Sequence, residues 1–430
     1  MLRISAIVIV LIVALFGLNV PAARGASIQV LPRDSGYLLI GGQNGTWFES
    51  GQAPRLEKVD LFNFSVRTLV PAVGPGVVWT GGWNGSQWLI SGFGVAGGPN
   101  GSNPYLYLYN GQTQIRGSSE EQYGAEASWR GGDVFATSSN GRDWLLSGLG
   151  SGILPSYSPS EVNHMSLATF DGNNFTDLSG ELPEQMDAIL YANAWNGKLW
   201  LIGGGYADNG VLYSYDGSTF QDLTPQLKRM VLTFGSIQSL SWNGNYWLIG
   251  GMNFLAKYDG KEFTDLTPKL ISALGWTGTC CTSINAIAWN GQEWMMGGGA
   301  PIAQFLDSTA WLASYTSNNF VNLSPNLGPV STEVNASSIL TVTSTGDSWI
   351  IGGYANGHGM LYSDELSTFT NLSKLVSNFT YVNWVGAGAP RGHTVPHIIK
   401  KPILDFSIPW VILVIYEERL RDIQLLDSAP

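Results

Sequence analysis

Acidic side chains gather in two stretches of this chain, and they could perform acid–base chemistry. Two carboxyl groups held about 5–10 Å apart can act as the acid and the base of a glycosidase. The acidic residues are Glu120, Glu121, Glu126, Glu181, Glu184 and Asp187. Because the same carboxylates can serve solubility alone, a carbohydrate-active hydrolase or lyase is one alternative and a non-catalytic surface is the other.

Four aromatic side chains outside the most regular parts of the sequence could contact a partner. They are Tyr157, Tyr206, Trp276 and Trp311. Exposed aromatic rings stack on sugars or anchor a protein partner, whereas buried ones shield one part of a fold from another. Both interpretations stay open, and we take the four aromatics with Glu181 and Glu184 as the candidate binding residues.

The chain has two cysteines, Cys280 and Cys281, and four histidines. Adjacent cysteines in an exported chain can form a strained vicinal disulfide, and strain makes such a bond redox-labile. A metal site would need further ligands, which the neighbourhood of these cysteines lacks. We therefore expect a local disulfide within a loop, no metal and no cofactor.

A short phrase that returns seven times must provide the scaffold for these residues. It consists of an Asn-Gly-type turn, then Trp and aliphatic residues, then a pair of small residues, most clearly at 195–204, 242–251 and 289–298. The turn residues align at Ser35, Asn84, Asn140, Asn196, Asn243, Asn290 and Thr345, which are 47 to 56 residues apart. A repeat of this length is typical of solenoids, propellers and arrays.

Each repeat unit predicts four short β-strands. A second phrase, as at 215–220 and 258–263, places Asp-Gly between an aromatic residue and a following Phe. Asn-Gly and Asp-Gly between apolar runs indicate hairpins with type I′ turns, in which both central residues have positive φ. We call the four strands a to d, and in one unit they are expected at residues 237–242, 247–251, 255–258 and 263–266.

Seven such meanders arranged around an axis form a β-propeller. A linear array of small sheets would leave long strand edges exposed, whereas a closed ring protects them. We therefore predict an all-β, seven-bladed β-propeller of four-stranded antiparallel blades. Pro32 interrupts strand a of the first unit at residues 28–31, and residues 379–386 resemble a further strand a. Those residues either close the ring onto the first unit or open an eighth blade, so eight blades are the alternative.

The aliphatic run with a double Gly, then Tyr-Asp, then an aromatic residue and a Leu, resembles the kelch repeat of galactose-oxidase-type propellers over residues 28–375. This resemblance implies a fold and no particular activity. The chain departs from the kelch pattern in a shorter connection and in the residues where kelch repeats usually carry Trp, which here are Phe220, Phe263, Phe320 and Phe369. Residues 214–220 also resemble the Asp-box of sialidase-type propellers, which implies the same ring.

The chemistry of these two enzyme families is only weakly indicated. A sialidase needs an Arg cluster with a Tyr nucleophile, but Arg116, Arg130 and Arg229 do not recur at equivalent positions of the units. Galactose oxidase needs copper held by two Tyr and two His. Only His164 and His358 fall within the repeats, and nothing groups them in the sequence. The sequence therefore favours a protein without catalytic activity.

The loops of such a meander divide between two faces. The tight a–b and c–d turns lie on one face, and the b–c and d–a loops lie on the other. These second loops are long and differ from unit to unit, at 93–105, 116–132, 148–164, 270–283, 298–311 and 322–336. Because binding surfaces are usually built from variable loops on a rigid scaffold, we expect any function on this face, near the central channel.

Composition and the N-terminal segment restrict location and partners. The net charge is −11, and too few basic residues are present to neutralise the phosphates of nucleic acid. Arg3, the apolar residues 4–20 and the small residues before Ala26 indicate an export signal, which is either cleaved or retained as a membrane anchor. Asn-x-Ser/Thr sequons fit export, and the glycosylation candidates are Asn44, Asn100, Asn335 and Asn378.

The sequence thus predicts three regions. Residues 1–26 are the signal peptide or anchor, residues 27–388 form the propeller, and residues 389–430 are an extension without the repeat, for which we expect low order. The leading hypothesis is a secreted or cell-surface protein that binds a protein or a glycan through its long loops. A structural component of the cell envelope is a further alternative, and the oligomeric state is not predicted.

Overall fold

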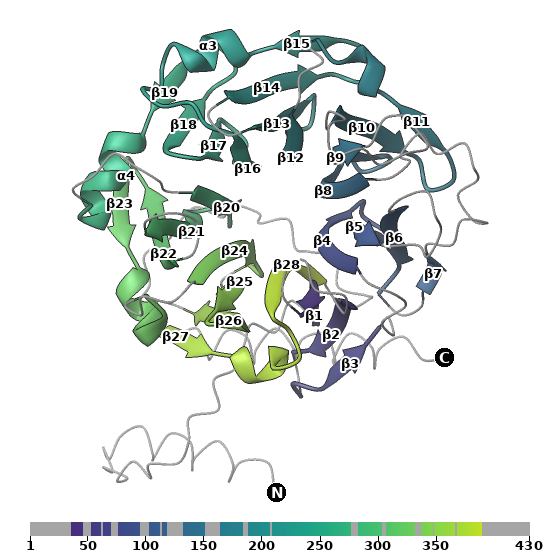
Figure 1. Cartoon of the computed structure of the whole chain (residues 1–430), viewed down its shortest axis with the longest axis vertical. Helices are drawn as coiled ribbons and strands as arrows, with labels where there is room; N and C mark the ends of the chain where they lie inside the picture. Colours follow the sequence, from purple (N-terminus) through teal and green to yellow (C-terminus); the bar gives the residue numbers. More distant parts are fainter. Residues whose placement is uncertain are drawn as a thin grey trace, which may run out of the picture. The chain divides into compact units, whose positions relative to one another are not determined.

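The repeat folds into seven four-stranded antiparallel sheets that follow one another around a central axis (Figure 1). This confirms the predicted all-β, seven-bladed propeller. The computed structural model describes residues 36–45, 53–61, 63–69, 76–94, 103–111, 114–117, 132–150, 164–183, 188–206, 209–276, 283–302, 307–331, 337–346, 348–365 and 368–388. All of these belong to the first of two units, Met1–Pro390, and the second unit is Arg391–Pro430. The predicted N-terminal signal and C-terminal extension lie outside the described residues.

Each sheet is one blade, whose four strands run in order from the axis to the rim. The innermost strands, one for each blade, are β28 (Tyr381–Gly388), β4 (Gly76–Trp83), β8 (Gly132–Ser139), β12 (Ile189–Trp195), β16 (Ile237–Trp242), β20 (Ser283–Trp289) and β24 (Ser337–Ser344). The second strands are β1 (Tyr37–Asn44), β5 (Trp88–Gly94), β9 (Trp144–Gly150), β13 (Trp200–Tyr206), β17 (Trp247–Gly251), β21 (Trp294–Ile302) and β25 (Ser348–Ala355). We number the blades 1 to 7 in this order.

The third and fourth strands complete the blades toward the rim. The third strands are β2 (Ala53–Asp60), β6 (Asn103–Tyr109), β10 (His164–Phe170), β14 (Asn209–Tyr215), β18 (Phe254–Tyr258), β22 (Asp307–Thr316) and β26 (His358–Glu365). The outer strands are β3 (Val66–Thr68), β7 (Gln114–Gly117), β11 (Phe175–Asp177), β15 (Phe220–Asp222), β19 (Phe263–Asp265), β23 (Asn319–Asn322) and β27 (Thr368–Asn371). The hydrophobic core lies between blades, as where Leu248 of blade 5 packs with Trp294 of blade 6.

The C-terminal strand β28 closes the ring by pairing with β1 in the order β28-β1-β2-β3. Seven blades are therefore correct, and the eight-blade alternative is wrong. The ring of Trp384 lies against Gly41, Gly81 and Gly386, where a Cβ on Gly81 or Gly386 would come within 2.6 Å of it. The other six inner strands carry only Ala, Ser or Thr at the position equivalent to Trp384. The large ring of Trp384 thus distinguishes the closing strand from the other six inner strands.

Every inner strand contains a β-bulge opposite the pair of small residues in the second strand. In blade 6 the register shifts between Ile284 and Ala286, which pair with Gly298 and Gly297. A Cβ on Gly298 would lie 1.7 Å from the carbonyl oxygen of Ser283. The corresponding distance is 1.9 to 2.0 Å in blades 1, 2, 3, 4 and 7. The second glycine of each pair therefore provides room for the bulge.

The first residue of each pair instead contacts the next blade. A Cβ on Gly203 would lie 2.5 Å from Ile237 Cγ2 of blade 5. Blades 2 and 3 carry Ser91 and Ser147 at this position, and there the next blade supplies a polar partner. Ser91 Oγ lies 2.6 Å from Thr137 Oγ1, and Asn193 Nδ2 donates to Ser147 Oγ at 2.7 Å. The two small residues thus have different roles, one within a blade and one between blades.

The Asn-Gly turns differ from the predicted type I′ geometry. Gly244 has φ 95°, but Asn243 is not in the positive-φ region, so only one central residue is left-handed. Asn243 Oδ1 accepts the backbone N–H groups of Asn245 at 2.9 Å and Tyr246 at 2.8 Å, which makes a four-residue loop. The prediction was wrong because the Asn side chain replaces the second left-handed residue. Two consecutive positive-φ residues do occur, at Ser317-Asn318 and Asn356-Gly357.

In the part of the chain that the structure describes, short helices follow the outer strands of five blades, and a repeated corner begins each one. They are η1 (Ser179–Glu181), α3 (Thr224–Lys228), α4 (Thr267–Leu274), η2 (Ser324–Ser331) and η3 (Ser373–Val376). In blade 5, Asp265 Oδ1 accepts the N–H of Thr267 at 2.9 Å, and Thr267 Oγ1 accepts the N–H of Leu255 at 2.9 Å. The other four corners repeat both bonds. The corner, which has Asp or Asn, then Leu, then Thr or Ser, is therefore structural.

We expect Gly298→Ala to destabilise the protein because its new Cβ would overlap the Ser283 carbonyl oxygen. Backbone must shift to admit it, which costs about 1–3 kcal/mol. Gly180→Ala is the matched control, since Gly180 is exposed and a Cβ on it would meet no atom within 4 Å. Its effect should stay within about 0.5 kcal/mol. Urea unfolding measures both, and equal stabilities of the two variants would contradict the role assigned to the bulge.

Candidate functional site

The bulge brings one residue of each inner strand to the point where neighbouring inner strands meet around the axis. These residues stand between the two register positions flanking each shift, and we call them the bulge ring: Asn383, Trp79, Phe135, Tyr191, Gln238, Asn285 and Leu340. All except the buried Asn383 are half-buried. Bulges commonly re-aim a side chain beside a functional site. The bulge ring is therefore the first place to look for ligand contacts.

Three consecutive members of the bulge ring are aromatic and touch one another across blade boundaries. The ring centroids of Trp79 and Phe135 are 5.4 Å apart, and those of Phe135 and Tyr191 are 5.3 Å apart with planes at 63°. Burial raises the pKa of the Tyr191 hydroxyl, and the nearby Tyr206 raises it further. Tyr206 ends the second strand of blade 4 and is 63% exposed. We call these four residues the aromatic arc.

The opposite part of the bulge ring carries amides that join blades together. Asn285 Nδ2 donates to Ser338 Oγ and to the Ile339 carbonyl, both at 3.0 Å, in the next blade. Asn383 Nδ2 donates to the carbonyl of Val78 at 3.3 Å. Because these amides hold the wall together, the aromatic arc is the part of the ring that offers side-chain surface to a ligand.

The arc lies toward the face of the long loops. In each blade the a–b and c–d turns are at one edge, as the pairs Trp242↔Trp247 and Tyr258↔Phe263 show, and Gly251↔Phe254 marks the opposite edge. The strand ends that carry the long loops therefore share one face, as expected. Tyr206 pairs with Asn209 at this edge, so the arc runs from the channel wall toward the mouth.

Asp133 lies two residues before Phe135 in the inner strand β8. Burial alone raises the pKa of its carboxyl to about 7. A carboxyl that exchanges its proton near neutral pH can act as a general acid or donate a hydrogen bond, which an ordinary aspartate cannot do at that pH. Among the described residues, no group of three or more His, Cys, Asp and Glu could hold a metal ion.

The structure separates the residues that the sequence analysis selected. Tyr206 is 63% exposed and Trp311 is 2% exposed, so the buried one of the two interpretations left open holds for Trp311. It belongs to strand β22 instead of a loop, pairs with Gly298 and packs with the core between blades 5 and 6. The half-buried Trp276 covers it edge-on, with ring centroids 5.7 Å apart at 89°.

The other selected residues are not brought to the aromatic arc. Glu181 is exposed in η1, beyond the outer strand of blade 3. Asn44 and Asn378 are exposed, which agrees with but does not test their glycosylation. The remaining selected residues lie outside the described part of the chain: Tyr157, Glu120, Glu121, Glu126, Glu184, Asp187, Cys280, Cys281, Asn100 and Asn335.

Sequence reasoning missed Trp79, Phe135 and Tyr191, although a signal exists. Each stands five residues before the turn Asn of its unit, namely Asn84, Asn140 and Asn196. Gln238, Asn285 and Leu340 occupy the same position, five residues before the turn residue, in later units. This position varies inside an otherwise regular strand, and such variation within a scaffold indicates a position that packing does not determine.

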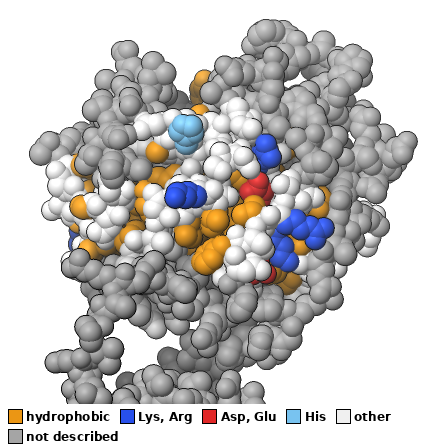
Figure 2. Space-filling model, turned by 90° about the horizontal axis from the view of Figure 1, so that it is seen from below, with side chains coloured by type: hydrophobic (Ala, Val, Ile, Leu, Met, Phe, Trp, Pro, Cys, Tyr) orange, Lys and Arg blue, Asp and Glu red, His pale blue; other side chains and the backbone are white. Residues whose placement is uncertain are grey.

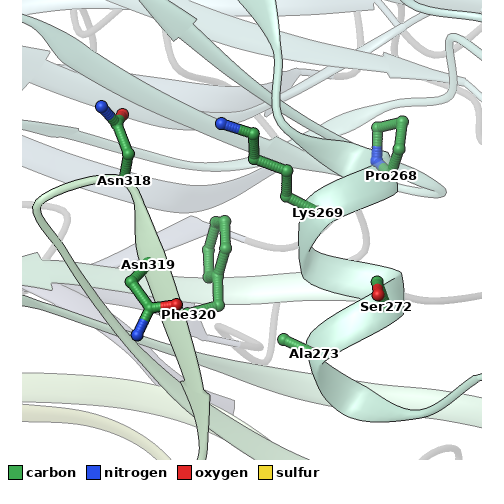
Figure 3. Close-up of a pocket in the computed structure, with 7 residues that line it drawn as sticks. All are labelled: Pro268, Lys269, Ser272, Ala273, Asn318, Asn319 and Phe320. Carbon is green, nitrogen blue, oxygen red and sulfur yellow. The ribbon is translucent and has the colours of Figure 1, made fainter.

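A separate groove of about 490 Å³ opens between α4 of blade 5 and β23 of blade 6 (Figure 3). Its lining is Pro268, Lys269, Ser272, Ala273, Asn318, Asn319 and Phe320. Figure 3 shows Lys269 and Ala273 on the helix facing Asn319 and Phe320 on the strand. Helix α4 follows the outer strand β19, and β23 is itself an outer strand. The groove therefore lies at the rim and is separate from the aromatic arc.

Charge is sparse on the surface that Figure 2 shows. Lys and Arg side chains stand singly or in one small group among uncharged ones, and this view has no continuous basic patch. Among the described residues no helix is long and apolar enough to cross a membrane.

Comparisons with known proteins identify no family. No family model matches the chain, and no curated protein matches it. A solved Lactobacillus plantarum protein is 11% identical over 81% of this chain and 98% of its own, with a TM-score of 0.49. Sqt1 from Chaetomium thermophilum is 13% identical over 78% of this chain and 83% of its own, with a TM-score of 0.43. We assign this propeller to no family.

An enzyme is also among the similar structures. Acylaminoacyl peptidase from Pyrococcus horikoshii is 12% identical over 71% of this chain and 48% of its own, with a TM-score of 0.41. At such identities and TM-scores we transfer no function from these proteins. These comparisons do not support the expected kelch-type relationship. The sheets themselves show a seven-bladed propeller.

We expect Asp133→Asn to stabilise the protein at pH 8 and to have little effect at pH 4. The folded state keeps the Asp133 proton up to about pH 7, whereas the unfolded state loses it near its ordinary value of 3.8. The stability that this residue contributes is therefore complete below about pH 4 and is lost as pH rises through 7. The gain at pH 8 should be on the order of 2 kcal/mol.

Thermal unfolding at both pH values measures this difference. Asp259→Asn is the control, because the backbone N–H groups of Glu262 and Lys261 lower the pKa of Asp259 and should allow no gain at pH 8. A gain for Asp133→Asn of the same size at pH 4 and pH 8 would show that the carboxyl is not protonated by burial.

Proposed function

We propose that this chain is an exported, non-catalytic propeller that binds a glycan at the long-loop mouth of its channel. The observation that supports this is the aromatic arc, in which Trp79, Phe135 and Tyr191 touch in series and the exposed Tyr206 extends them. Aromatic rings offer apolar faces to the C–H faces of pyranoses. We favour a glycan over a protein partner because the three inner arc residues lie on the innermost strands around the axis and not on the outer surface of the ring.

The rigidity of the arc favours binding. Its three inner residues lie on bulged strands, and the glycine opposite each bulge, Gly92, Gly148 or Gly204, fits closely against the bulged backbone. Their backbone positions are therefore set before a ligand arrives. Preorganised rings lose little conformational freedom on binding. The phenol of Tyr206, at 63% exposure, can also exchange hydrogen bonds with sugar hydroxyls.

A carbohydrate-active enzyme is the second candidate, and Asp133 is the observation that favours it. Its pKa of about 7 suits a general acid at neutral pH. Glycoside hydrolysis needs a second carboxyl about 5–10 Å away, and Glu181 stands beyond the outer strand of its blade. Hydrolysis of an oligosaccharide panel that Asp133→Asn abolishes would establish this candidate in place of the first.

Removing one aromatic ring from the arc should weaken glycan binding. We expect Trp79→Ala, Tyr191→Ala and Tyr206→Ala each to lower the affinity for a glycan found on an array by about tenfold, which corresponds to about 1.4 kcal/mol. Leu340→Ala is the matched control, because Leu340 occupies the same bulge position on the opposite side of the ring. Calorimetric titration measures the affinities.

Two results would contradict the proposal. One is that no glycan on the array binds the protein. The other is that the three arc variants bind as tightly as Leu340→Ala does. Loss of binding to a protein partner in the arc variants, without any glycan binding, would assign the site to a protein ligand, the other class that the sequence allows.

Export can be tested separately. We expect the protein secreted by its native host to begin after the small residues at 22–26 if the N-terminal segment is a cleaved signal, or at the initiating Met if the segment is an anchor. N-terminal sequencing of the protein from the culture medium and from membranes distinguishes the two. Recovery of the full chain from the cytoplasm alone would contradict export.

A further inference from the structure

A second set of aromatic side chains lies at the other mouth of the channel, on the face of the tight turns. The last residue of the inner strand is Trp in four blades, namely Trp83, Trp195, Trp242 and Trp289. Each packs on the Trp that begins the next strand, with ring centroids 4.3 to 5.3 Å apart. Trp83 is 42% exposed, whereas its partner Trp88 is 7% exposed. The other three inner rings are half-buried and their partners are buried.

Trp195, Trp242 and Trp289 also pack against the cores between blades, but other blades form their cores without such a ring. Blades 3 and 7 have Ser139 and Ser344 at the same position. Both keep the buried partner, since Trp144 is 0% and Trp349 is 2% exposed. Each Trp near the start of a second strand is thus buried, whether or not the inner strand beside it ends in Trp. The outward Trp is an additional residue in four of these blades.

An amide accompanies each outward ring. The residue that follows each Trp is a turn Asn, and its Oδ1 accepts two backbone N–H groups at 2.8 to 3.0 Å. These bonds orient the amide and use its oxygen, while Nδ2 is a donor that can serve a ligand. Each of the four blades therefore places a partly exposed aromatic ring beside an oriented amide, and the ring of Trp83 is the most exposed of the four. A ring beside an amide suits one face and one hydroxyl of a pyranose.

We propose that Trp83, Trp195, Trp242 and Trp289 form four equivalent sugar-binding stations, which together hold a neutral polysaccharide of repeating pyranose units. Equivalent stations on one rigid ring match a ligand whose own units repeat. Once one station binds, the others meet the same chain at high effective concentration, so weak contacts add up to firm retention. This proposal is independent of the aromatic arc, which is a single site without a repeat.

The chain itself supplies the substitution for the test. Serine already occupies this position in blades 3 and 7, so a Trp83→Ser, Trp195→Ser, Trp242→Ser, Trp289→Ser variant should fold. Affinity gels containing soluble β-1,3-glucan, mannan, xylan or glycol chitin measure retention. We expect the unaltered protein to be retarded by at least one polymer, each single variant to be retarded less, and the quadruple variant to lose roughly 100-fold or more in apparent affinity.

Further measurements separate the stations from general damage and from the arc. Thermal unfolding should show the quadruple variant folded, and if it does not fold, the four single variants and their Trp→Phe counterparts carry the test. Each Phe variant should retain more binding than its Ser counterpart because it keeps an aromatic face. Gly180→Ala, at an exposed residue outside both sites, should bind the polymer as the unaltered protein does. Loss of retention in Tyr191→Ala together with full retention in the quadruple variant would assign the polymer to the arc.

Three outcomes would overturn the proposal. The first is that none of the four polymers retards the unaltered protein. The second is that the folded quadruple variant is retarded as strongly as the unaltered protein. The third is that a free monosaccharide competes at the same concentration of sugar units as the polymer, since four linked stations must prefer the linked ligand.

Discussion

This propeller depends on one steric constraint. Each inner strand carries a β-bulge, and the residue opposite it in the second strand is a glycine, which leaves room for the bulged backbone. The carbonyl of Ser283 occupies the place where a Cβ on Gly298 would stand, and five other blades repeat this contact at 1.9 to 2.0 Å. The first glycine of the pair admits a β-branched side chain of the next blade, such as Ile237 against Gly203. Two adjacent small residues therefore set both the shape of one blade and its distance from the next.

The bulge also separates the residues that build the ring from those whose side chains can contact a ligand. The residue it displaces leaves the regular ladder of its own sheet, so its type is not dictated by cross-strand pairing. Trp79, Phe135 and Tyr191 occupy this position in three successive blades, and amides or Leu occupy it in the other four. A repeated backbone feature thus displays the least repeated side chains, which is how a symmetric scaffold acquires one asymmetric site.

A salt bridge on the surface of the described part contributes little to the fold. It joins the sequence neighbours Arg142 and Asp143 on an exposed turn, where such pairs are worth little. Burial instead raises the pKa values of Asp133 and Glu57, so folding makes both carboxyls easier to protonate than they are in the unfolded chain. Aromatic pairs, close glycine contacts and the corners that follow the outer strands stabilise the ring. These interactions depend weakly on salt, and the buried acids favour acidic conditions.

The sequence by itself determined the seven repeats, most strand positions and the places of the turns, because these follow from a period that is local to each unit. It also selected Tyr206 and the face of the long loops. Only the tertiary structure decided that β28 closes the ring, that Trp311 is buried beneath Trp276, and that Trp79 meets Phe135. Those two rings are 56 residues apart in the chain, and no pattern within a unit states which residues of successive units touch. Contacts between blades arise from the radial packing of the closed ring, so the periodicity predicted the scaffold and the closure created the site.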